Sequence, residues 1–211
     1  MLPPGNLEVR ELRRPVEARA AVELLTDAFL DFPAMQLLVG HDDGARARLR
    51  RLFAMEFDVD SAVEALGAEI DGSLVGVLTY LDSPGCSAIS SGRLVSFMRI
   101  AGPRVVRAMR MFGRIERVHP RAPHRHLPTV GVSTEWQSQG VGEALMKAFQ
   151  ERCDADGKVA YLETIRRTDP ARRSHERFYR WLGYGVTDVV PMTGEWEALT
   201  MTRPVRGLAT G

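Results

Sequence analysis

The C-terminal half of the chain carries titratable side chains whose types and spacing suit proton transfer. Arg172, His175 and Tyr179 are three and four residues apart, so a helix would place them on one face. Glu163 belongs to a short strand, where a carboxylate either takes part in chemistry or only forms an ion pair. At neutral pH a tyrosine is protonated and a carboxylate is ionised, so the two types can serve as acid and base.

A polar turn with two glycines, Gln137–Gly142, joins an apolar strand to an amphipathic helix. The helix has one apolar face, made of Val141, Ala144, Leu145, Ala148 and Phe149. Gly157 is expected to end it. The first N–H groups of a helix have no partner within the helix, and the helix dipole is positive there. Because glycine lets a ligand approach the main chain, the turn predicts a phosphate site.

Two other glycine motifs that bind phosphate do not fit this turn. A Walker loop needs Gly-Lys followed by Ser or Thr, whereas Gly142 is followed by Glu143. A dinucleotide fingerprint needs three glycines after its strand and an acidic residue about 20 positions later. Glu163 lies at a suitable distance, but only two of the glycines are present.

Two ordered motifs resemble those of the GNAT superfamily of N-acetyltransferases. Gln137–Gly142, after the apolar strand that begins at Leu127, resembles the superfamily's cofactor motif. Leu162-Glu-Thr164 followed by Phe178–Tyr184 resembles its second motif, with Tyr184 in place of the usual Phe. The long helical insertion before the central strand and the "His-Leu-Pro" entry resemble the branch that includes puromycin acetyltransferase. The resemblance implies acetyl-CoA as cofactor and a single-domain fold with a mixed, mostly antiparallel sheet.

The resemblance also implies roles for individual residues. The pyrophosphate would bind the main chain of Gln139, Gly140, Val141, Gly142 and Glu143, with Gln137 and Ser138 at the entry. The pantetheine arm would pair like an extra strand with Val130, Gly131 and Val132, and the N–H of Gly131 is placed to stabilise an oxyanion. Tyr179 occupies the position of the general acid that protonates the leaving thiolate. Glu163 matches a position that serves as a base or holds water, with His175 and Glu135 as reserves.

One departure from the family pattern concerns a cofactor contact. Relatives commonly carry an Asn between the Glu and the Tyr of the second motif, and this interval has none. Arg172 or His175 could replace that contact, so His175 joins the candidate cofactor-binding residues. Cys153 lies beside the apolar face of its helix and is interpreted as packing, which favours direct transfer over an acyl-enzyme.

Length and composition predict one soluble domain, residues 1–211. A formal net charge of +1 gives no overall signal for nucleic acid or an anionic membrane. Cys86 and Cys153 are too few for a disulfide framework or a zinc site, and no metal is expected. Without a signal peptide or an apolar run of membrane length, we expect a cytoplasmic protein. The arginines between Arg166 and Arg180 are interpreted as a solvated helix face rather than as a phosphate cluster.

Periodicity and turn residues predict the remaining elements. The N-terminal part, residues 7–81, is expected to begin with a strand at Leu7–Leu12 and a helix that follows Pro15 and runs through Phe29. A short helix or loop is expected at Ala34–Val39, and a further helix from about Ala45 to Phe57. The part ends with a hairpin at Glu69–Tyr80, which turns at Asp71-Gly72. Next come two helices within Ser90–Val118, in the insertion 90–118 near the acceptor site, and a polar loop at His119–His126. The acetyl-CoA-binding core, 127–190, adds a strand at Val159–Ile165 and a helix from Asp169 to Gly183. The side chains of Phe178, Trp181 and Leu182 are expected to point inward from this helix. Two strands, at Tyr184–Val190 and Glu195–Met201, follow.

These elements alternate in the manner of an α/β (α+β) fold, with a sheet of about seven strands and helices on both faces. The main functional hypothesis is transfer of an acetyl group to a small primary amine by direct attack in a ternary complex. A peptide or protein amine as acceptor, and a CoA-binding sensor without turnover, are the alternatives. A methionine-lined pocket between Ser90–Val118 and Ala34–Val39 would favour a small apolar amine, and an open groove a peptide. A homodimer is the expected assembly.

Overall fold

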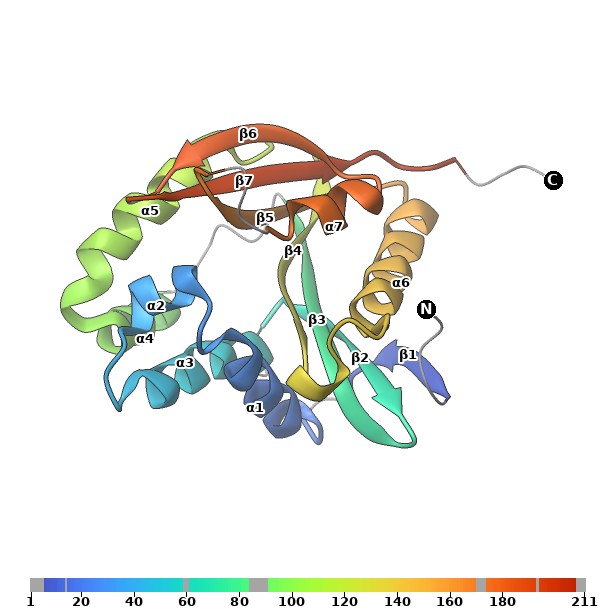
Figure 1. Ribbon diagram of the computed structural model, residues 1–211, viewed down its shortest axis with the longest axis horizontal. Coiled ribbons are helices and arrows are strands. Elements are labelled where there is room, and N and C mark those ends of the chain that lie inside the picture. The colour runs from blue at the N-terminus through green and yellow to red at the C-terminus, as the bar shows by residue number, and fades with distance from the viewer. Residues whose placement is uncertain are drawn as a thin grey trace.

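Seven strands form one sheet in the order β1-β2-β3-β4-β5-β7-β6 (Figure 1). The computed structural model describes residues 6–13, 15–58, 61–83, 91–169, 174–192 and 194–207, with only the backbone of 91–95. The strands are β1 (Leu7–Glu11), β2 (Glu64–Ile70), β3 (Ser73–Ser83), β4 (His124–Val132), β5 (Val159–Arg167), β6 (Gly185–Pro191) and β7 (Trp196–Arg203). The α-helices are α1 (Ala18–Phe29), α2 (Pro33–Val39), α3 (Ala45–Ala54), α4 (Ser91–Ala101), α5 (Val105–Val118), α6 (Val141–Ala155) and α7 (Glu176–Trp181). Short 3-10 helices are η1 (Met55–Phe57), η2 (Gly102–Arg104) and η3 (Thr134–Trp136).

The hairpin of β2 and β3 turns at Asp71 and Gly72, as the sequence predicts. Both residues have positive φ, 50° and 77°, which is the conformation of a two-residue hairpin turn. The antiparallel ladder continues from β3 to β4, so the N-terminal half of the chain supplies most of one arm of the sheet.

The sheet opens where β4 and β5 meet, because these two strands pair over only part of their length. They are the parallel pair, with matched residues from His124 and Val159 to Leu127 and Leu162. The next residue on β4, Pro128, has no N–H to donate to a neighbouring strand. Beyond that point β5, β7 and β6 turn away from β1 to β4 (Figure 1).

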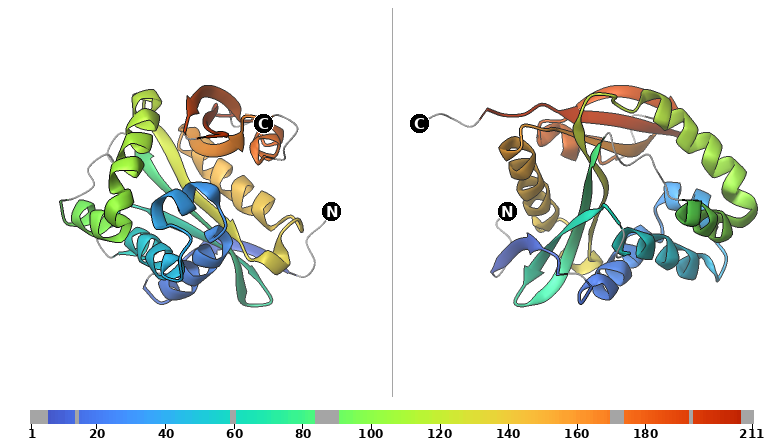
Figure 2. Two further views of the ribbon diagram at one scale, coloured as in Figure 1. Left: turned by 60° about the vertical axis from the view of Figure 1, so that its left-hand side comes forward. Right: turned by 180° about the vertical axis from the view of Figure 1, so that it is seen from behind.

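Helices cover both faces of the sheet, which confirms the predicted architecture. Helix α6 lies on one face, and α1 to α5 lie on the other side of β4 (Figures 1 and 2). Leu145, Met146 and Phe149 of α6 are fully buried against residues of β2, β3 and β5. On the other face, Leu25 of α1 and Leu49 of α3 are equally buried. The helices α2 and α5 pack against the arm formed by β5, β6 and β7.

Sequence periodicity predicted most of these elements and misplaced some side chains. Val16 precedes α1 and is 84% exposed, so it does not continue the helical stripe. Trp181 was expected to point inward, but it is 64% exposed, because the buried face of α7 is formed by Tyr179 and by Leu182 just after it. The described part of the helix expected from Asp169 to Gly183 is only α7. Calls on Pro170, Arg172, Arg173 and Cys86 lie outside the described residues.

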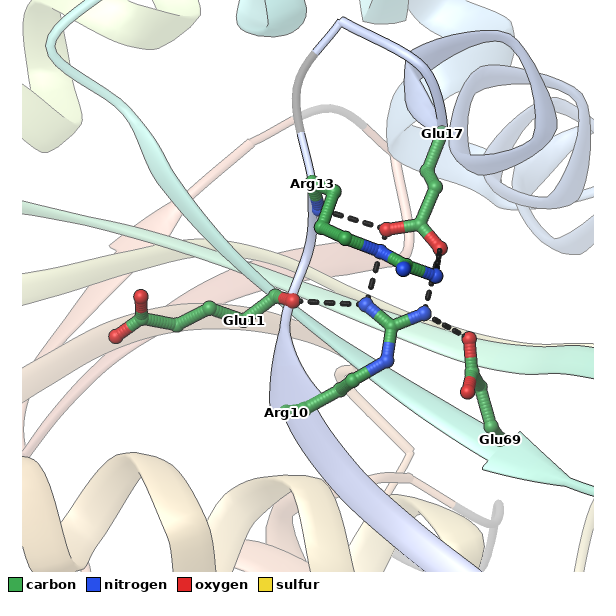
Figure 3. Close-up of polar contacts among 5 residues, drawn as sticks. All are labelled: Arg10, Glu11, Arg13, Glu17 and Glu69. Atoms are coloured by element: carbon green, nitrogen blue, oxygen red, sulfur yellow. Dashed lines mark hydrogen bonds and ion pairs between the residues drawn. The ribbon is translucent and has the colours of Figure 1, made fainter. Parts of the chain in front are cut away.

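A charged network fixes the N-terminal strand to the first helix (Figure 3). The guanidinium of Arg10 donates to both carboxylate oxygens of Glu17, at 2.9 and 2.5 Å, and also binds the carboxylate of Glu69 on β2. The N–H of Arg13 donates to Glu17 at 2.6 Å. These hydrogen bonds, the one from Arg10 above all, lower the pKa of Glu17 to about 2.

Candidate active site

The N-terminus of α6 presents main-chain donors at the opening of the sheet. Ser138 and Gly140 both have left-handed φ, 62° and 87°, which turns the chain from η3 into the helix. The first intrahelical bond is made by the N–H of Ala144, to the carbonyl of Gly140. No side chain caps this end, so the N–H groups of the first helical turn are available to an anion. The turn therefore has the geometry that its glycines predicted.

The hydrogen-bond register of β4 decides which of its peptide groups face the opening. The N–H of Ser133 donates to the carbonyl of Val75 at 2.9 Å. Bonded and non-bonded pairs alternate along an antiparallel ladder, so Gly131 and Val77 form a bonded pair. The N–H of Gly131 is therefore directed to β3. This corrects the expectation that it faces the reacting group, since the sheet already uses it.

The neighbours of Gly131 have the opposite orientation. The same alternation turns the N–H and C=O groups of Val130 and Val132 toward β5, where the pairing has already ended. The side-chain amide of Gln137 donates to the carbonyl of Val132 at 3.1 Å, which agrees with this orientation. The free edge of β4 can thus pair with an extended ligand, because the N–H groups of Val130 and Val132 face the cleft without a partner on β3.

Gly131 and Gly142 are glycines for different reasons. A Cβ on Gly131 would lie 2.8 Å from Leu25 and 3.3 Å from Ala28, so the glycine allows α1 to pack directly on β4. A Cβ on Gly142 would meet nothing nearer than Val132, at 3.7 Å. Packing within the protein does not require a glycine at Gly142. The space beside it is part of the cleft, where a ligand can approach the main chain.

Tyr179 of α7 lies across the cleft from the free edge of β4. It is buried, with 8% of its surface exposed, and its ring packs 5.4 Å from Phe178 and 6.1 Å from Tyr184. Burial raises the pKa of Tyr179 to about 12, which keeps the hydroxyl protonated at neutral pH. A thiolate formed in the same cleft is also desolvated, so its own pKa rises and the proton transfer stays feasible.

A single cavity of about 1770 Å³ runs from the donor side of the sheet to the helices on the other side. This volume exceeds the roughly 300–1,000 Å³ of a usual small-molecule pocket, so the cavity has room for two ligands. At one end it reaches Gly140, Gly142 and Tyr179. At the other end its wall is aromatic and methionine-rich, with Phe29, Phe32, Met35, Met109, Met111 and Phe112.

Besides His119, His126 and His175, the cavity wall carries five carboxylates. They are Glu56, Asp58, Glu116, Glu143 and Glu163. No Lys or Arg is among the described residues that line it, although the chain has 28 of them. Glu56 accepts hydrogen bonds from the hydroxyls of Thr79 and Thr129, at 2.9 and 3.2 Å. The acceptor half of the cavity therefore favours a molecule with an apolar body and a positive charge.

Glu163 holds two histidines at the junction of β4, β5 and the end of α5. One carboxylate oxygen is 2.6 Å from Nε2 of His126, and the other is 3.7 Å from Nδ1 of His119. Burial opposes ionisation of Glu163, but the charge of His126 and the hydrogen bonds of the two histidines lower its pKa to about 2. The aromatic ring of Tyr161 packs against both histidines, at 4.7 and 5.3 Å between ring centroids.

The structure corrects the interpretation of His119–His126 as a structural loop with its histidines on no common face. The strand β4 starts at His124, so His124 and His126 are two residues apart on a strand and point to the same face. His119 reaches them from the end of α5, with His119 and His124 ring centroids 4.8 Å apart. The His-x-His alternation was the available signal. Among the described residues, no group of three or more His, Cys, Asp or Glu side chains could hold a metal.

His175 and Glu135, the reserve candidates for the base, lie nearer the surface. His175 is exposed at the start of α7 and lines the donor side of the cavity. Glu135 lies in η3, where its backbone carbonyl accepts a hydrogen bond from Gln139 at 2.6 Å. Cys153 is fully buried in the core, and burial raises the pKa of its thiol to about 12. This supports packing as its role.

Ion pairs engage several of the arginines that were interpreted as a solvated helix face. Arg166 of β5 pairs with Glu176 at 2.9 Å and with Glu197 at 3.1 Å. Arg180 pairs with the same Glu176 at 2.8 Å, one helical turn away. Their charges are satisfied within the protein, which argues against a phosphate cluster, although Arg166 lies on a strand and not on a helix face.

The free edge of β4 and the N-terminus of α6 can hold an extended, phosphate-bearing molecule, and the cavity on the opposite side has room for a second molecule. Residues 22–184 match the sequence profile of the Acetyltransferase (GNAT) family, which is more than half of the chain. The chain therefore belongs to the GNAT acetyltransferase family. It is an N-acetyltransferase that uses acetyl-CoA.

Solved structures share the fold across nearly the whole chain. A structure described as histone acetyltransferase HPA2 and related acetyltransferase, from Corynebacterium glutamicum, has 24% identity and a TM-score of 0.70, with all of both chains covered. PaiA N-acetyltransferase from Thermoplasma acidophilum, in complex with coenzyme A, has 12% identity and a TM-score of 0.56, covering 94% of this chain and 99% of that one. An aminoglycoside 6'-N-acetyltransferase complexed with coenzyme A has 14% identity and a TM-score of 0.56, covering 95% and 98%.

Proposed function

We propose that the protein transfers an acetyl group from acetyl-CoA directly to the primary amine of a small, mainly apolar molecule that is cationic at neutral pH. The cavity lining carries this proposal: aromatic and methionine side chains combine with carboxylates, and no described Lys or Arg takes part. The carboxylates attract an ammonium group and repel an acceptor that bears a carboxylate of its own. An amino acid would therefore be a poor acceptor.

On the donor side, the residues fit the cofactor as the sequence predicted, with one change at β4. The pyrophosphate binds the main chain of Gln139, Gly140, Val141, Gly142 and Glu143. The entry is lined by Gln137, Ser138 and His175. The pantetheine arm pairs with Val130 and Val132. The free N–H of Val130, rather than that of Gly131, is the donor for the thioester oxygen. Acetyl-CoA supplies the activated acetyl group when bound.

Tyr179 is the proposed general acid of this reaction. The amine nitrogen forms a bond to the acetyl carbon while the carbon–sulfur bond breaks. Before attack, the ammonium form of the amine loses one proton toward the cluster around Glu163. The leaving thiolate then takes the hydroxyl proton of Tyr179, and the second proton lost by the nitrogen restores that hydroxyl by way of the solvent. The products are the neutral amide, the free thiol and one released proton.

The apolar lining of the acceptor side favours a small amine over a peptide. Helices α2 and α5 pack on one another and on the β5–β7 arm, and they line the apolar end of the cavity. The relatives of known structure include both a histone acetyltransferase and an aminoglycoside 6'-N-acetyltransferase.

Thiol release from acetyl-CoA with a panel of acceptors tests the function. We expect an arylalkylamine to be acetylated faster than the α-amino acid with the same side chain and faster than an unblocked peptide. Faster acetylation of the peptide would contradict the small-amine proposal. Binding of acetyl-CoA without turnover on any amine would indicate a sensor module.

The variant Tyr179→Phe tests the general acid. We expect kcat to fall about 10²–10⁴-fold while acetyl-CoA affinity stays at the wild-type value, because the hydroxyl acts only during proton transfer. Tyr184→Phe is the matched control, a buried tyrosine next to Tyr179 that does not line the cavity. Equal rates for wild type and Tyr179→Phe would show that another group protonates the thiolate.

Other assignments extend this proposal. The insertion 90–118, which contains α4 and α5 (Figure 2), supports the puromycin acetyltransferase-like branch, and we propose that it shapes the acceptor side while 127–190 bind the donor. No helix among the described residues has the length and apolarity of a membrane span. The homodimer and the cytoplasmic setting remain predictions from the sequence.

A further inference from the structure

Acetylation of an ammonium group requires a proton acceptor in the cleft. Glu163 is the carboxylate at that place, but both of its oxygens face histidines, so it is poorly placed to take a proton from a ligand. We propose that His126 is the proton acceptor of the acceptor side, and that Glu163 is a positioning residue that fixes the tautomer of His126. This inference rests on the proposed N-acetyltransferase function.

The backbone sets the protonation of the first histidine. Nδ1 of His124 lies 2.8 Å from the carbonyl oxygen of Ala122. A carbonyl can only accept, so the hydrogen is on Nδ1. Burial lowers the pKa of His124, which keeps the ring neutral and leaves Nε2 as an acceptor.

The second histidine completes the chain of hydrogen bonds. Nε2 of His119 lies 3.1 Å from Nε2 of His124, so His119 must donate in this bond. Its other nitrogen faces Glu163 at 3.7 Å, and that carboxylate raises the pKa of His119. His119 therefore favours the charged form and occupies one oxygen of Glu163.

His126 is left with one ring nitrogen, Nδ1, that has no hydrogen-bond partner among the residues the structure describes. Its Nε2 lies 2.6 Å from the second oxygen of Glu163, and an ionised carboxylate only accepts, so the hydrogen is on Nε2. In the neutral ring, the lone pair is then on Nδ1. Both His126 and Glu163 line the cavity, and the His126 side chain is 18% exposed. A ring held by a carboxylate through one nitrogen, with the other nitrogen free, is the arrangement of a general base.

The position of His126 determines the route of the proton. A strand rises about 3.3 Å per residue, so His126 lies on the order of 13 Å along β4 from Val130. The proton therefore leaves the amine through water in the cavity and arrives at Nδ1. Loss of that proton frees the lone pair of the nitrogen, which then bonds to the acetyl carbon, and His126 later returns the proton to solvent.

Charges on several elements act on His126. Glu163 and His124 interact with it electrostatically, and the rings of His119 and Tyr161 lie 5.4 and 5.3 Å from its own. From β3 the residue paired with His126 is Leu81, which is apolar. Glu163 is in hydrogen-bond contact with His126, and Glu163 and Glu116 both act on the neighbouring His119. Replacing Glu163 by Gln should therefore change the pH dependence of the rate as well as its size.

The test compares His126→Gln and Glu163→Gln with wild type over pH 6–9. We expect kcat of His126→Gln to fall about 10²-fold or more and to lose the acid limb of its pH profile, with acetyl-CoA affinity unchanged. Glu163→Gln should keep that limb but shift it. His41→Gln, an exposed histidine outside the cavity, is the matched control.

A measurement that does not depend on turnover distinguishes a failure of the proton-acceptor role of His126 from a failure of the proposed acetyltransferase function. Nitrogen NMR of the histidine rings should show hydrogen on Nε2 of His126 in wild type and a changed tautomer ratio in Glu163→Gln. Hydrogen on Nδ1 of wild-type His126, or wild-type kinetics in His126→Gln, would overturn the proton-acceptor role. A wild-type protein that acetylates no amine would instead refute the proposed function.

Discussion

The two left-handed glycines at the ends of α6 allow a matched test of the phosphate site. Gly140 precedes the helix with φ of 87°, and Gly157 follows it with φ of 64°. Alanine in this conformation costs about 1–2 kcal/mol, so Gly140→Ala and Gly157→Ala should lose similar stability. An unfolding entropy of about 2.1 cal/mol/K per residue over 211 residues converts this into a drop in Tm of about 2–5 °C.

Acetyl-CoA binding should separate the two variants. The turn at Gly140 positions the free N–H groups of the first helical turn, whereas Gly157 lies at the opposite end. A shift of that turn that loses one hydrogen bond to a charged phosphate costs about 1.5–3 kcal/mol. The Kd for acetyl-CoA should therefore rise about 10–150-fold in Gly140→Ala and stay at the wild-type value in Gly157→Ala.

Isothermal titration calorimetry with acetyl-CoA, beside thermal unfolding of each variant, measures both quantities. If Gly140→Ala loses stability but binds acetyl-CoA as tightly as wild type, the N-terminus of α6 is not the pyrophosphate site. If Gly157→Ala weakens binding equally, the loss reflects general destabilisation, and the argument from local geometry fails.

Two further predictions concern the stability of the fold and the chemistry of its buried thiol. Because hydrogen bonds from Arg10 and Arg13 lower the pKa of Glu17 to about 2, its stabilising effect is complete above the ordinary pKa of 4.5 and is lost as pH falls from 4.5 to 2. In urea unfolding at pH 7, Glu17→Gln should be about 1–2 kcal/mol less stable than wild type, and near pH 2 the two proteins should be equally stable. A stability difference that stays constant at all pH values would contradict the ionic explanation. The thiol of Cys153, fully buried and with a pKa raised to about 12, should resist iodoacetamide until the protein unfolds, as mass spectrometry of the peptide can show. Cys153→Ala should lower Tm yet keep acetyl transfer, and loss of transfer in a folded variant would support an acyl-enzyme after all.

Short-range patterns were enough to predict several parts of this protein. The turn Gln137–Gly142 before α6 and the hairpin turn at Asp71 depend on the conformation of a few consecutive residues, and glycine positions report that conformation directly. The positions of most helices followed from apolar periodicity over one or two turns, but α3 ends at Ala54 rather than Phe57 and α7 begins at Glu176. The order of two motifs was enough to indicate the family, which the match over residues 22–184 confirmed.

The functional arrangement of the acceptor side depends on contacts between distant segments. The histidine cluster brings the end of α5, the start of β4 and Glu163 of β5 together, and no local pattern encodes that contact. Likewise, the peptide orientation of Gly131 follows from its register with β3, which is set by strand pairing across more than 50 residues. The sequence alone determined where phosphate could bind, because a helix end and its glycines are local. Only the tertiary structure decided which groups share the acceptor cavity and which histidine nitrogen is free, because those depend on the opening of β4 from β5.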